Sequence, residues 1–360
     1  MRVTRSRLGA IGPLAAIGWG RAWRCSLIAL APALATTACG GQTTIERHLV
    51  FVRITAPVRA TIWIADADGG HAHRLTRGFS ARVAPDGRTI AVARPHGIYL
   101  VDSDGKRERR LSSTKMWPEA WTRDGRWLVA TTDSTLVAVE VRSGQRHLLA
   151  RGPILGISLA PSGQRVVYAH APRATPDAPC GTHSDLYSVA LTGTGRLRLT
   201  HDGLSESPVW GATRIAFSRV STRRFPGCLA AGVWTIAPDG TRLRAVLPRP
   251  PLSLSRHGYY GLEPVAWLSA RELLVAVRSE WGGEAARLDL GGRLRRLTFF
   301  TRRSGHRVRQ VFYIDKAARD GRLAIGGGGD EQVTISIIRT SDGRPLFVHR
   351  GTLCCPDWNR

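Results

Sequence analysis

The sequence is poor in lysine and lacks motifs on which several classes of enzyme depend. Of its 52 basic residues only Lys106, Lys115 and Lys316 are lysines, so arginine carries nearly all of the positive charge. No Cys-x-x-Cys occurs, which leaves zinc and thiol redox sites without support. No Gly-x-Ser-x-Gly occurs, which argues against a serine hydrolase. The chain is therefore predicted not to be an enzyme, and no catalytic, cofactor-binding or metal-binding residue is assigned.

Two other motifs suggest chemistry but lack the partners that the chemistry needs. Ser112–Lys115 matches Ser-x-x-Lys, yet the companion Ser-Asp-Asn and Lys-Thr-Gly motifs are absent. His71 and His73 have a spacing that would allow them to share a metal ion. They are expected in an exposed turn without carboxylate partners, so neither motif is predicted to form a site.

Acidic residues are also scarce. The chain of 360 residues has 27 of them, which gives a formal net charge of +25. An arginine bias of this kind is also expected from a GC-rich genome, so it does not by itself require an anionic partner. The charge does favour attraction to anionic lipid headgroups or wall polymers. No nucleic-acid partner is expected, because the N-terminal residues predict export.

The apolar run near the N-terminus is too short to cross a bilayer. It covers Ser26–Ala38, which is 13 residues, whereas a transmembrane helix needs about 20. Five arginines and no acidic residue precede it, as is typical of a signal peptide. Residues 1–38 are therefore predicted to be a signal peptide.

Three outcomes of processing remain open. Thr37-Ala38-Cys39-Gly40 resembles a bacterial lipobox, although Thr36 stands where leucine is usual. In that case Cys39 is lipidated, residues 39–46 form a tether, and the protein is held at the outer face of the cytoplasmic membrane or in the periplasm. Cleavage after Ala35 would instead give a secreted protein, and no cleavage would leave an anchor.

A unit of two strands around a glycine turn recurs through the chain. The first two copies are Ile62–Thr76 (IWIADADGGHAHRLT) and Ile98–Ser112 (IYLVDSDGKRERRLS). Further copies are Leu136–Ala150, Leu186–Thr200, Val233–Leu247, Ala285–Thr298 and Val333–His349. A second unit alternates with the first, in Ala84–Ala93, Thr122–Ala130, Ala160–Tyr168, Trp210–Phe217, Trp267–Val277 and Arg319–Ile325.

Alternating apolar residues on either side of Asp-Gly indicate β-hairpins. A calcium loop that begins at Asp66 would need Gly at its sixth position and Glu at its twelfth, but His71 and Arg77 stand there. Asp-x-Asp-Gly is therefore predicted to be a structural turn. Two hairpins make one four-stranded sheet, and radial packing of such sheets gives a β-propeller.

The two ends of the repeat region complement each other. Arg47–Ile54 has the pattern of a second strand without its first, and Thr352–Trp358 has the pattern of an innermost strand without its second. We expect both ends to complete one blade, which protects two sheet edges. The fold class predicted for residues 47–360 is all-β, a seven-bladed propeller of four-stranded antiparallel blades, with six or eight blades as alternatives. Six tryptophans at strand positions are expected to pack between blades, namely Trp63, Trp121, Trp210, Trp234, Trp267 and Trp358.

The pattern Asp-x-Asp-Gly…Arg-Leu-Thr…Pro-Asp-Gly-Arg-x-Ile-Ala resembles the TolB-like repeat, a bacterial WD40-like propeller repeat. The resemblance covers residues 47–358. It implies a periplasmic or surface binding scaffold and not one particular reaction. The usual propeller of this family has six blades, so the count of seven departs from it.

Every long insertion is predicted on one edge of the blades, the long-loop face, and the tight Asp-Gly turns on the other. The insertions are His170–Asp185, Arg219–Gly232, Pro248–Glu263 and Phe299–Gln310. Long loops on a rigid scaffold are where binding usually occurs. The candidate binding residues are Arg223, Arg224, Phe225, Arg256, His257, Tyr259, Tyr260, Arg302, Arg303, His306 and Arg307.

Arginine with tyrosine suits recognition of carboxylates, phosphates or protein partners. The function expected is a monomeric, non-catalytic scaffold that binds a protein or an anionic envelope polymer. A propeller enzyme of the lyase, lactonase or dehydrogenase kind, with a central-channel site, is one alternative. An accessory or sensor subunit of a transport system is another, and an undirected basic surface remains possible.

Four cysteines remain for an oxidising compartment. Cys180 and Cys228 fall in equivalent insertions of neighbouring blades, and a disulfide between them is expected. Cys354 and Cys355 are adjacent, and bond geometry makes such pairing uncommon, so their state is left open.

Overall fold

The computed structural model describes residues 48–56, 59–171, 184–220, 231–249, 251, 259–279, 282–297, 299–303, 306–310, 313–317, 323–328, 334–341, 345–350 and 353–358. All of these lie in one compact unit, residues 45–360. Every regular element among them is a β-strand. Within these ranges no helix has the length and apolar character needed to cross a membrane.

Most strands form four-stranded antiparallel sheets, as predicted. One sheet contains β1 (His48–Ala56), β2 (Arg59–Asp66), β3 (His73–Arg77) and β30 (Leu353–Trp358). The next contains β4 (Ser80–Val83), β5 (Thr89–Arg94), β6 (Gly97–Asp102) and β7 (Glu108–Ser112). A third contains β8 (Trp117–Trp121), β9 (Trp127–Thr131), β10 (Thr135–Glu140) and β11 (Arg146–Arg151). A fourth contains β12 (Ile154–Leu159), β13 (Arg165–His170), β14 (Asp185–Ala190) and β15 (Leu197–Arg198).

The remaining strands form three further sheets. An eight-stranded sheet contains β16 (Ser205–Trp210), β17 (Ile215–Val220), β18 (Ala231–Ile236), β19 (Arg244–Leu247), β20 (Tyr259–Ser269), β21 (Glu272–Ser279), β22 (Gly282–Asp289) and β23 (Leu294–Leu297). β24 (Phe299–Arg303) and β25 (His306–Gln310) form a two-stranded sheet. The last sheet contains β26 (Tyr313–Ala317), β27 (Leu323–Gly328), β28 (Thr334–Arg339) and β29 (Pro345–Arg350).

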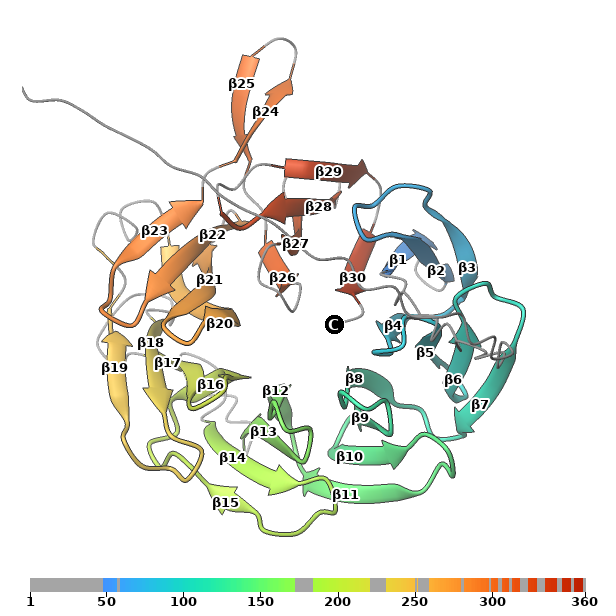
Figure 1. Cartoon of the computed structure of the whole chain (residues 1–360), viewed down its shortest axis with the longest axis horizontal. Helices are drawn as coiled ribbons and strands as arrows, with labels where there is room; N and C mark the ends of the chain where they lie inside the picture. The colour runs from blue at the N-terminus through green and yellow to red at the C-terminus, as the bar shows by residue number, and fades with distance from the viewer. Residues whose placement is uncertain are drawn as a thin grey trace, which may run out of the picture. The chain divides into compact units, whose positions relative to one another are not determined.

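The sheets follow one another around a common centre (Figure 1). β4, β8, β12, β16, β20, β26 and β30 lie nearest that centre. β30 pairs antiparallel with β1, so one sheet joins strands from the two ends of the described chain. The eight-stranded sheet has two halves, β16–β19 and β20–β23, and among the described residues they are joined by one parallel pair, Ala231 with Gly261.

The Asp-x-Asp-Gly motifs are turns between the last two strands of a sheet, as predicted. Between β2 and β3 the Gly69 amide donates to the Asp66 carbonyl (2.8 Å), and the Gly70 amide donates to the Asp68 carboxylate (2.9 Å). Between β6 and β7 the Gly105 amide donates to the Asp102 carbonyl in the same way (2.8 Å). The bonds are local, which is why a short stretch of sequence is enough to specify the turn.

Glycines at the equivalent turns of other sheets, between the third strand and the outer strand, also touch the preceding sheet. A Cβ atom on the glycine would lie against the carbonyl oxygen of an outer strand: Gly144 against Leu111 at 3.0 Å, Gly193 against Leu148 at 2.6 Å, and Gly292 against Val246 at 2.8 Å. All three glycines have positive φ. Glycine is therefore required at these positions for two reasons, the backbone angle and the close contact between sheets.

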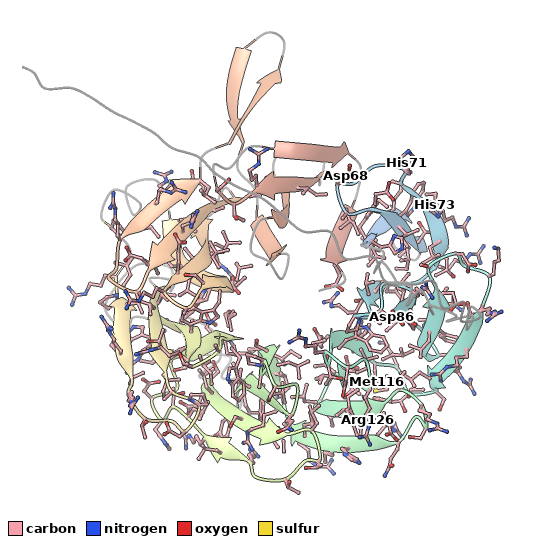
Figure 2. The ribbon with its side chains drawn as sticks, viewed as in Figure 1. Asp68, His71, His73, Asp86, Met116 and Arg126 are labelled. Atoms are coloured by element: carbon pink, nitrogen blue, oxygen red, sulfur yellow. The ribbon has the colours of Figure 1, made fainter. Side chains whose placement is uncertain are left out.

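The core lies between successive sheets. One apolar cluster joins Val50 and Ile62 to Ile90 and Val92 of the next sheet. Figure 2 shows side chains filling the space between neighbouring ribbons. Central strands such as β5 (TIAVAR) and β13 (RVVYAH) have four consecutive buried residues. The expected alternation fails in these strands, because both faces of the sheet are buried and polar residues have no exposed face to occupy.

Tryptophan packing between sheets is found at some of the predicted positions. Trp121 Nε1 of β8 donates to the Arg82 carbonyl of β4 (3.0 Å), and Trp267 Nε1 of β20 donates to the Val209 carbonyl of β16 (3.1 Å). Trp210 and Trp234 pack against the core between the fourth sheet and β16–β18. Trp63 differs, because it stacks on Phe51 of its own sheet. The side chain of Trp358 lies outside the described residues.

Outer-strand arginines add polar contacts between sheets. Each donates to a carbonyl oxygen just after the third strand of the next sheet: Arg109 to Val141 (2.5 Å), Arg244 to Leu290 (3.3 Å) and Arg295 to Ser341 (2.7 Å). His147 Nδ1 of the outer strand β11 likewise lies 3.1 Å from the carbonyl of Leu191, just after the third strand of the next sheet. Part of the arginine content therefore has a structural role.

We expect Gly193→Ala to destabilise the protein more than Gly125→Ala. Both glycines have positive φ, but a Cβ at Gly125 would meet no atom within 4 Å, whereas one at Gly193 would lie 2.6 Å from the Leu148 carbonyl. The backbone angle alone costs about 1 kcal/mol, and the added overlap should bring the loss at Gly193 to about 2–4 kcal/mol. Urea unfolding of the two variants measures both values. Equal losses would show that the contact between sheets contributes nothing.

Candidate binding face

Neighbouring strands run in opposite directions, so alternate connections reach opposite edges of the sheets. Residues 67–72, 84–88 and 103–107 are tight turns on one edge. Residues 171–184 join β13 to β14 and residues 221–230 join β17 to β18, and both connections belong to the other edge. Long connections therefore share the edge defined above as the long-loop face.

Five of the eleven candidate binding residues lie outside the described residues. This applies to the candidate binding residues Arg223, Arg224, Phe225, Arg256 and His257. It also applies to Cys39, Cys180 and Cys228. The lipid anchor and the disulfide therefore stay predictions.

The other candidate residues are on strands. Tyr259 and Tyr260 begin β20, an innermost strand. Arg302 and Arg303 lie on β24, paired with Arg307 and His306 of β25. The expectation of a loop at Phe299–Gln310 was wrong, because Ser304-Gly305 separates two strand-forming runs and the segment is a hairpin. Figure 1 shows this hairpin projecting outward, well away from the label of β20.

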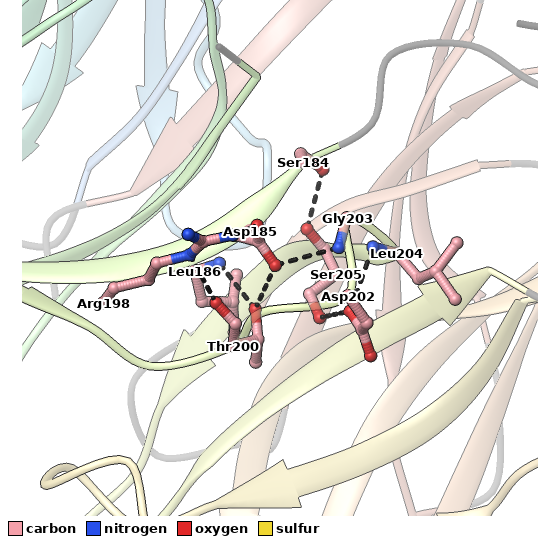
Figure 3. Close-up of polar contacts among 9 residues, drawn as sticks. All are labelled: Ser184, Asp185, Leu186, Arg198, Thr200, Asp202, Gly203, Leu204 and Ser205. Atoms are coloured by element: carbon pink, nitrogen blue, oxygen red, sulfur yellow. Dashed lines mark hydrogen bonds and ion pairs between the residues drawn. The ribbon is translucent and has the colours of Figure 1, made fainter.

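A buried carboxylate anchors the base of the longest connection on this face (Figure 3). Asp185, the first residue of β14, is 4% exposed. Its carboxylate accepts hydrogen bonds from Arg198 (2.6 Å), from the Thr200 hydroxyl (3.1 Å) and from the Gly203 amide (3.0 Å). A buried carboxylate with three donors fixes the positions of the groups around it. The strand end at Asp185 is thereby tied to the connection between β15 and β16.

A second set of bonds continues from this carboxylate toward β16. Ser184 Oγ donates to the Ser205 carbonyl (2.7 Å), and the Leu204 amide donates to Asp202 (3.1 Å). Asp202 also forms an ion pair with Arg219 at the end of β17. The residues that flank two of the long connections are therefore held in one network, which gives the long-loop face a rigid base.

Near the junction of β13 with the same long connection, His170 is held in its neutral form. Burial lowers its pKa, and its Nε2 donates to the Arg151 carbonyl (2.8 Å). The proton on Nε2 leaves Nδ1 as an acceptor, which has no hydrogen-bond partner among the described residues. His170 also lies edge-on to Tyr187, with ring centroids 5.6 Å apart.

Charged side chains also gather on the innermost strands. Arg82 of β4 donates to the Glu119 carbonyl of β8 (3.0 Å), and its Nε lies 4.0 Å from Asp357 of β30. Asp357 in turn accepts a hydrogen bond from the Val83 amide (3.0 Å). Three consecutive innermost strands, β30, β4 and β8, are linked by this group.

A second charged group lies on β16, β20 and β21. Glu263 pairs with Arg278 and accepts a hydrogen bond from Ser207 (2.8 Å). Ser207 has a φ of 50° and lies at an irregularity in the pairing of β16 with β17, so it strains the backbone beside the carboxylates. Burial raises the pKa of Glu206, Arg278 opposes this, and the Glu263 charge adds to it. A carboxylate with a raised pKa on an innermost strand is a feature shared with functional sites.

The turn with the two neighbouring histidines differs from expectation in one respect. His71 Nδ1 lies 2.7 Å from Asp66, so His71 does have a carboxylate partner, and its pKa is raised by the bond to Asp66. The turn lies at the outer part of its sheet (Figure 2). Among the described residues, no three His, Cys, Asp or Glu side chains gather as metal ligands would.

The long-loop face has a hollow that was not predicted from the sequence. This hollow has a volume of about 330 Å³ and lies between the sheets β4–β7 and β8–β11. Its lining residues are Phe79, Ala93, Arg94, Pro95, Lys115, Met116 and Trp117. They come from three separate connections and from the adjoining ends of β5 and β8, so no local motif could have predicted their meeting.

No protein-family model matches the chain, and no curated protein matches it. Solved structures do resemble it. TolB from Acinetobacter baumannii superposes with a TM-score of 0.50 and 14% identity, over 87% of this chain and 66% of that one. This chain thus spans just under two thirds of that TolB chain. The identity is too low to carry function from one chain to the other.

Two other structures are similar at comparable identity. An oligogalacturonate lyase from Vibrio parahaemolyticus has a TM-score of 0.55 and 11% identity, with 85% of each chain covered. The β-propeller domain of the Trilobed protease from Pyrococcus furiosus has a TM-score of 0.58 and 12% identity, over 84% of this chain and 94% of that one. The chain therefore has a β-propeller fold. That fold is shared by enzymes and by proteins that are not enzymes.

We expect Glu206→Gln and Glu108→Gln to change the pH dependence of stability in opposite directions. The pKa of Glu206 is raised in the folded protein, so its ionisation opposes folding above the unfolded pKa of about 4.5. The pKa of Glu108 is lowered by its bonds to Arg94, so its ionisation favours folding over the same range. Glu206→Gln should raise the free energy of unfolding at pH 7, and Glu108→Gln should lower it.

The difference for Glu206→Gln should shrink as the pH falls toward 4.5, because its raised folded pKa lies above that value. The difference for Glu108→Gln should persist down to about pH 4.5 and shrink only below it, as the pH falls through the lowered folded pKa. Urea unfolding between pH 3 and 8 measures both. A loss of stability in Glu206→Gln at pH 7 would contradict the rise in the pKa of Glu206 on burial.

Proposed function

We propose that this protein is a non-catalytic scaffold of the cell envelope, which binds a protein or an anionic envelope polymer through its long-loop face. The observation that supports this most directly is the asymmetry of the connections. One edge of the sheets has only short hydrogen-bonded turns among the described residues, whereas the other has the long connections 171–184 and 221–230. The network around Asp185 gives this edge a rigid base.

The hairpin β24–β25 adds charge to the proposed face. It places Arg302 and Arg303 on one strand opposite Arg307 and His306 on the other. Neighbouring cationic residues on a projecting hairpin repel one another. A bound anionic surface or acidic polymer would lower this repulsion, so such a partner is favoured. Tyr259 and Tyr260 begin an innermost strand, at the end that follows the connection 248–258.

The proposed scaffold has seven blades. The two halves of the eight-stranded sheet are counted as separate blades, since a single parallel pair joins them. β30 supplies the innermost strand of the blade that contains β1, β2 and β3. A blade built from both ends protects two edges that would otherwise be open. The protein is proposed to act as a monomer, with a disulfide between Cys180 and Cys228 joining two insertions.

Export and anchoring belong to the same proposal. A lipid on Cys39 would hold the scaffold at the outer face of the cytoplasmic membrane or in the periplasm. We expect Cys39→Ala to move the protein from the membrane fraction to the soluble fraction, because the acyl chains are then lost. Cys25→Ala, inside the proposed signal peptide, is the matched control and should stay with the membrane. Membrane retention of Cys39→Ala would exclude the lipid anchor.

The binding proposal is tested by capture from native envelopes with the full chain as bait. A variant with Arg302→Gln, Arg303→Gln and Arg307→Gln should retain about a tenth of the bound partner, since each lost charge contact is worth up to about 1 kcal/mol. The matched control removes the same charge from the tight-turn edge, with Arg88→Gln, Arg123→Gln and Arg142→Gln. Capture is quantified by mass spectrometry for proteins and by sugar and phosphate analysis for polymers.

The control variant should capture as much as the wild type. Equal losses in the two variants would mean that the basic surface is undirected and that the long-loop face is not the binding site. Retention of full capture by the hairpin variant would remove the hairpin from the proposal.

A second candidate function is a propeller enzyme with a site at the central channel. The observation in its favour is the group formed by Glu206, Ser207, Glu263 and Arg278 on and beside the innermost strands. A carboxyl group with a raised pKa beside a carboxylate that pairs with arginine can serve as an acid–base pair. Turnover of an acidic sugar polymer that is lost in both Glu206→Gln and Glu263→Gln would favour this function over the scaffold.

A further inference from the structure

The hollow between the sheets β4–β7 and β8–β11 has an apolar lining. Met116 forms part of it and is 1% exposed, while Phe79 is 42% exposed. Pro95 is exposed and the Trp117 ring is half-buried. A phenylalanine left this exposed beside a concave surface marks a site for apolar contact, because burying it there removes apolar area from water.

Two cations border the hollow, and they differ in their partners. Both terminal nitrogens of Arg94 bind the Glu108 carboxylate (2.7 Å each), and Arg94 Nε binds the Arg77 carbonyl (3.0 Å). The donors of Arg94 are thus committed to the protein itself. Lys115 Nζ lies 5.0 Å from the centre of the Trp117 ring, and it has no ion pair or hydrogen bond to another described residue.

Lys115 is therefore the charge that a ligand would neutralise. It is held over an aromatic ring and borders apolar surface, so a partner has to bring both an apolar group and a negative charge. A polymer of phosphates or sugar acids would leave Phe79 and Met116 without apolar contact. A protein segment with an aromatic side chain next to a carboxylate satisfies both requirements.

We propose that this hollow is an anchor site for an aromatic side chain of a protein partner, with the neighbouring carboxylate bound by Lys115. Phe79, Pro95 and Trp117 enclose the ring, and Met116 forms the floor. The proposal rests on the proposed function, because the hollow lies on the long-loop face, and it names the chemistry of the partner. It does not depend on the hairpin β24–β25, so the two can fail independently.

The probe is N-acetyl-L-phenylalanine, compared with N-acetyl-L-phenylalanine amide, which has the same ring but no charge. We expect the acid to bind the full chain about fivefold more tightly than the amide, which is the effect of one partly exposed ion pair. In Lys115→Gln the acid should lose that advantage and bind like the amide. Phe79→Ala should weaken both probes about equally, by about tenfold, because it removes apolar contact and no charge.

The scarcity of lysine supplies a specific readout. The chain has three lysines, so reductive methylation with ¹³C-formaldehyde gives three side-chain signals and one from the N-terminus if it is free, and the modified lysines keep their charge. The Lys115 signal should lie upfield of the other lysine signals because of the Trp117 ring, and it should be absent from Lys115→Gln. It should shift on addition of the acid and shift less with the amide.

Lys106→Gln is the matched control, since Lys106 pairs with Asp104 in an exposed turn on the opposite edge. It should bind both probes like the wild type, and the Lys106 signal should not move with either probe. The proposal is overturned if neither probe binds at 10 mM, if acid and amide bind equally, or if Lys115→Gln leaves the preference for the acid intact. If the probe experiments fail in one of these ways but the full chain still captures a partner through the hairpin, the anchor site is overturned and the proposed function is not.

Discussion

Close contact between successive sheets is the constraint on which the rest of this structure depends. The sheets β4–β7 and β8–β11 bury apolar side chains on both faces, so a sheet that moved away from its neighbour would expose a row of Val, Ile and Leu to water. The contact extends to the outer strands, where Gly193 brings its backbone against the carbonyl of Leu148. Indole and guanidinium groups such as those of Trp121 and Arg109 bridge the same boundaries at the inner and outer strands. Polar and apolar contacts therefore oppose the same separation of neighbouring sheets.

Burial of both faces leaves only the edges of the sheets for binding. On one edge the turns are short, and their polar groups are used up in bonds within the turn, as with the three bonds that Asp86 accepts from its neighbours. The other edge has the long connections 171–184 and 221–230, and a buried carboxylate at Asp185 fixes the end of the first of them. A rigid base lowers the entropy that a binding loop loses on meeting its partner, which is why the proposed function is assigned to that edge.

The sequence predicted what is local and missed what depends on distant residues. Asp-Gly turns, strand order and the pairing of β30 with β1 followed from short motifs and their spacing, since a turn is specified by four or five consecutive residues. Continuous apolar runs in β5 and β13 were less clear, because alternation applies only where one face is exposed to water. The hollow at Lys115, the pairing of Glu263 with Arg278 and the anchor at Asp185 bring together residues from separate strands. No spacing in the sequence encodes those meetings, so they became visible only with the fold.

Arginines with a structural role have to be separated from those free to bind before the excess of arginine can indicate a ligand. Arg109, Arg244 and Arg295 donate to backbone carbonyls of the next sheet, and Arg94, Arg198 and Arg287 pair with carboxylates of their own sheet. These side chains serve the fold, whatever the ligand is. A guanidinium group suits this use, because its planar array of donors can bridge two strands at once, whereas an ammonium group is a single strongly hydrated charge. The lysine beside an aromatic hollow is thus a more specific indication of binding than the net charge of +25, since no structural bond among the described residues accounts for it.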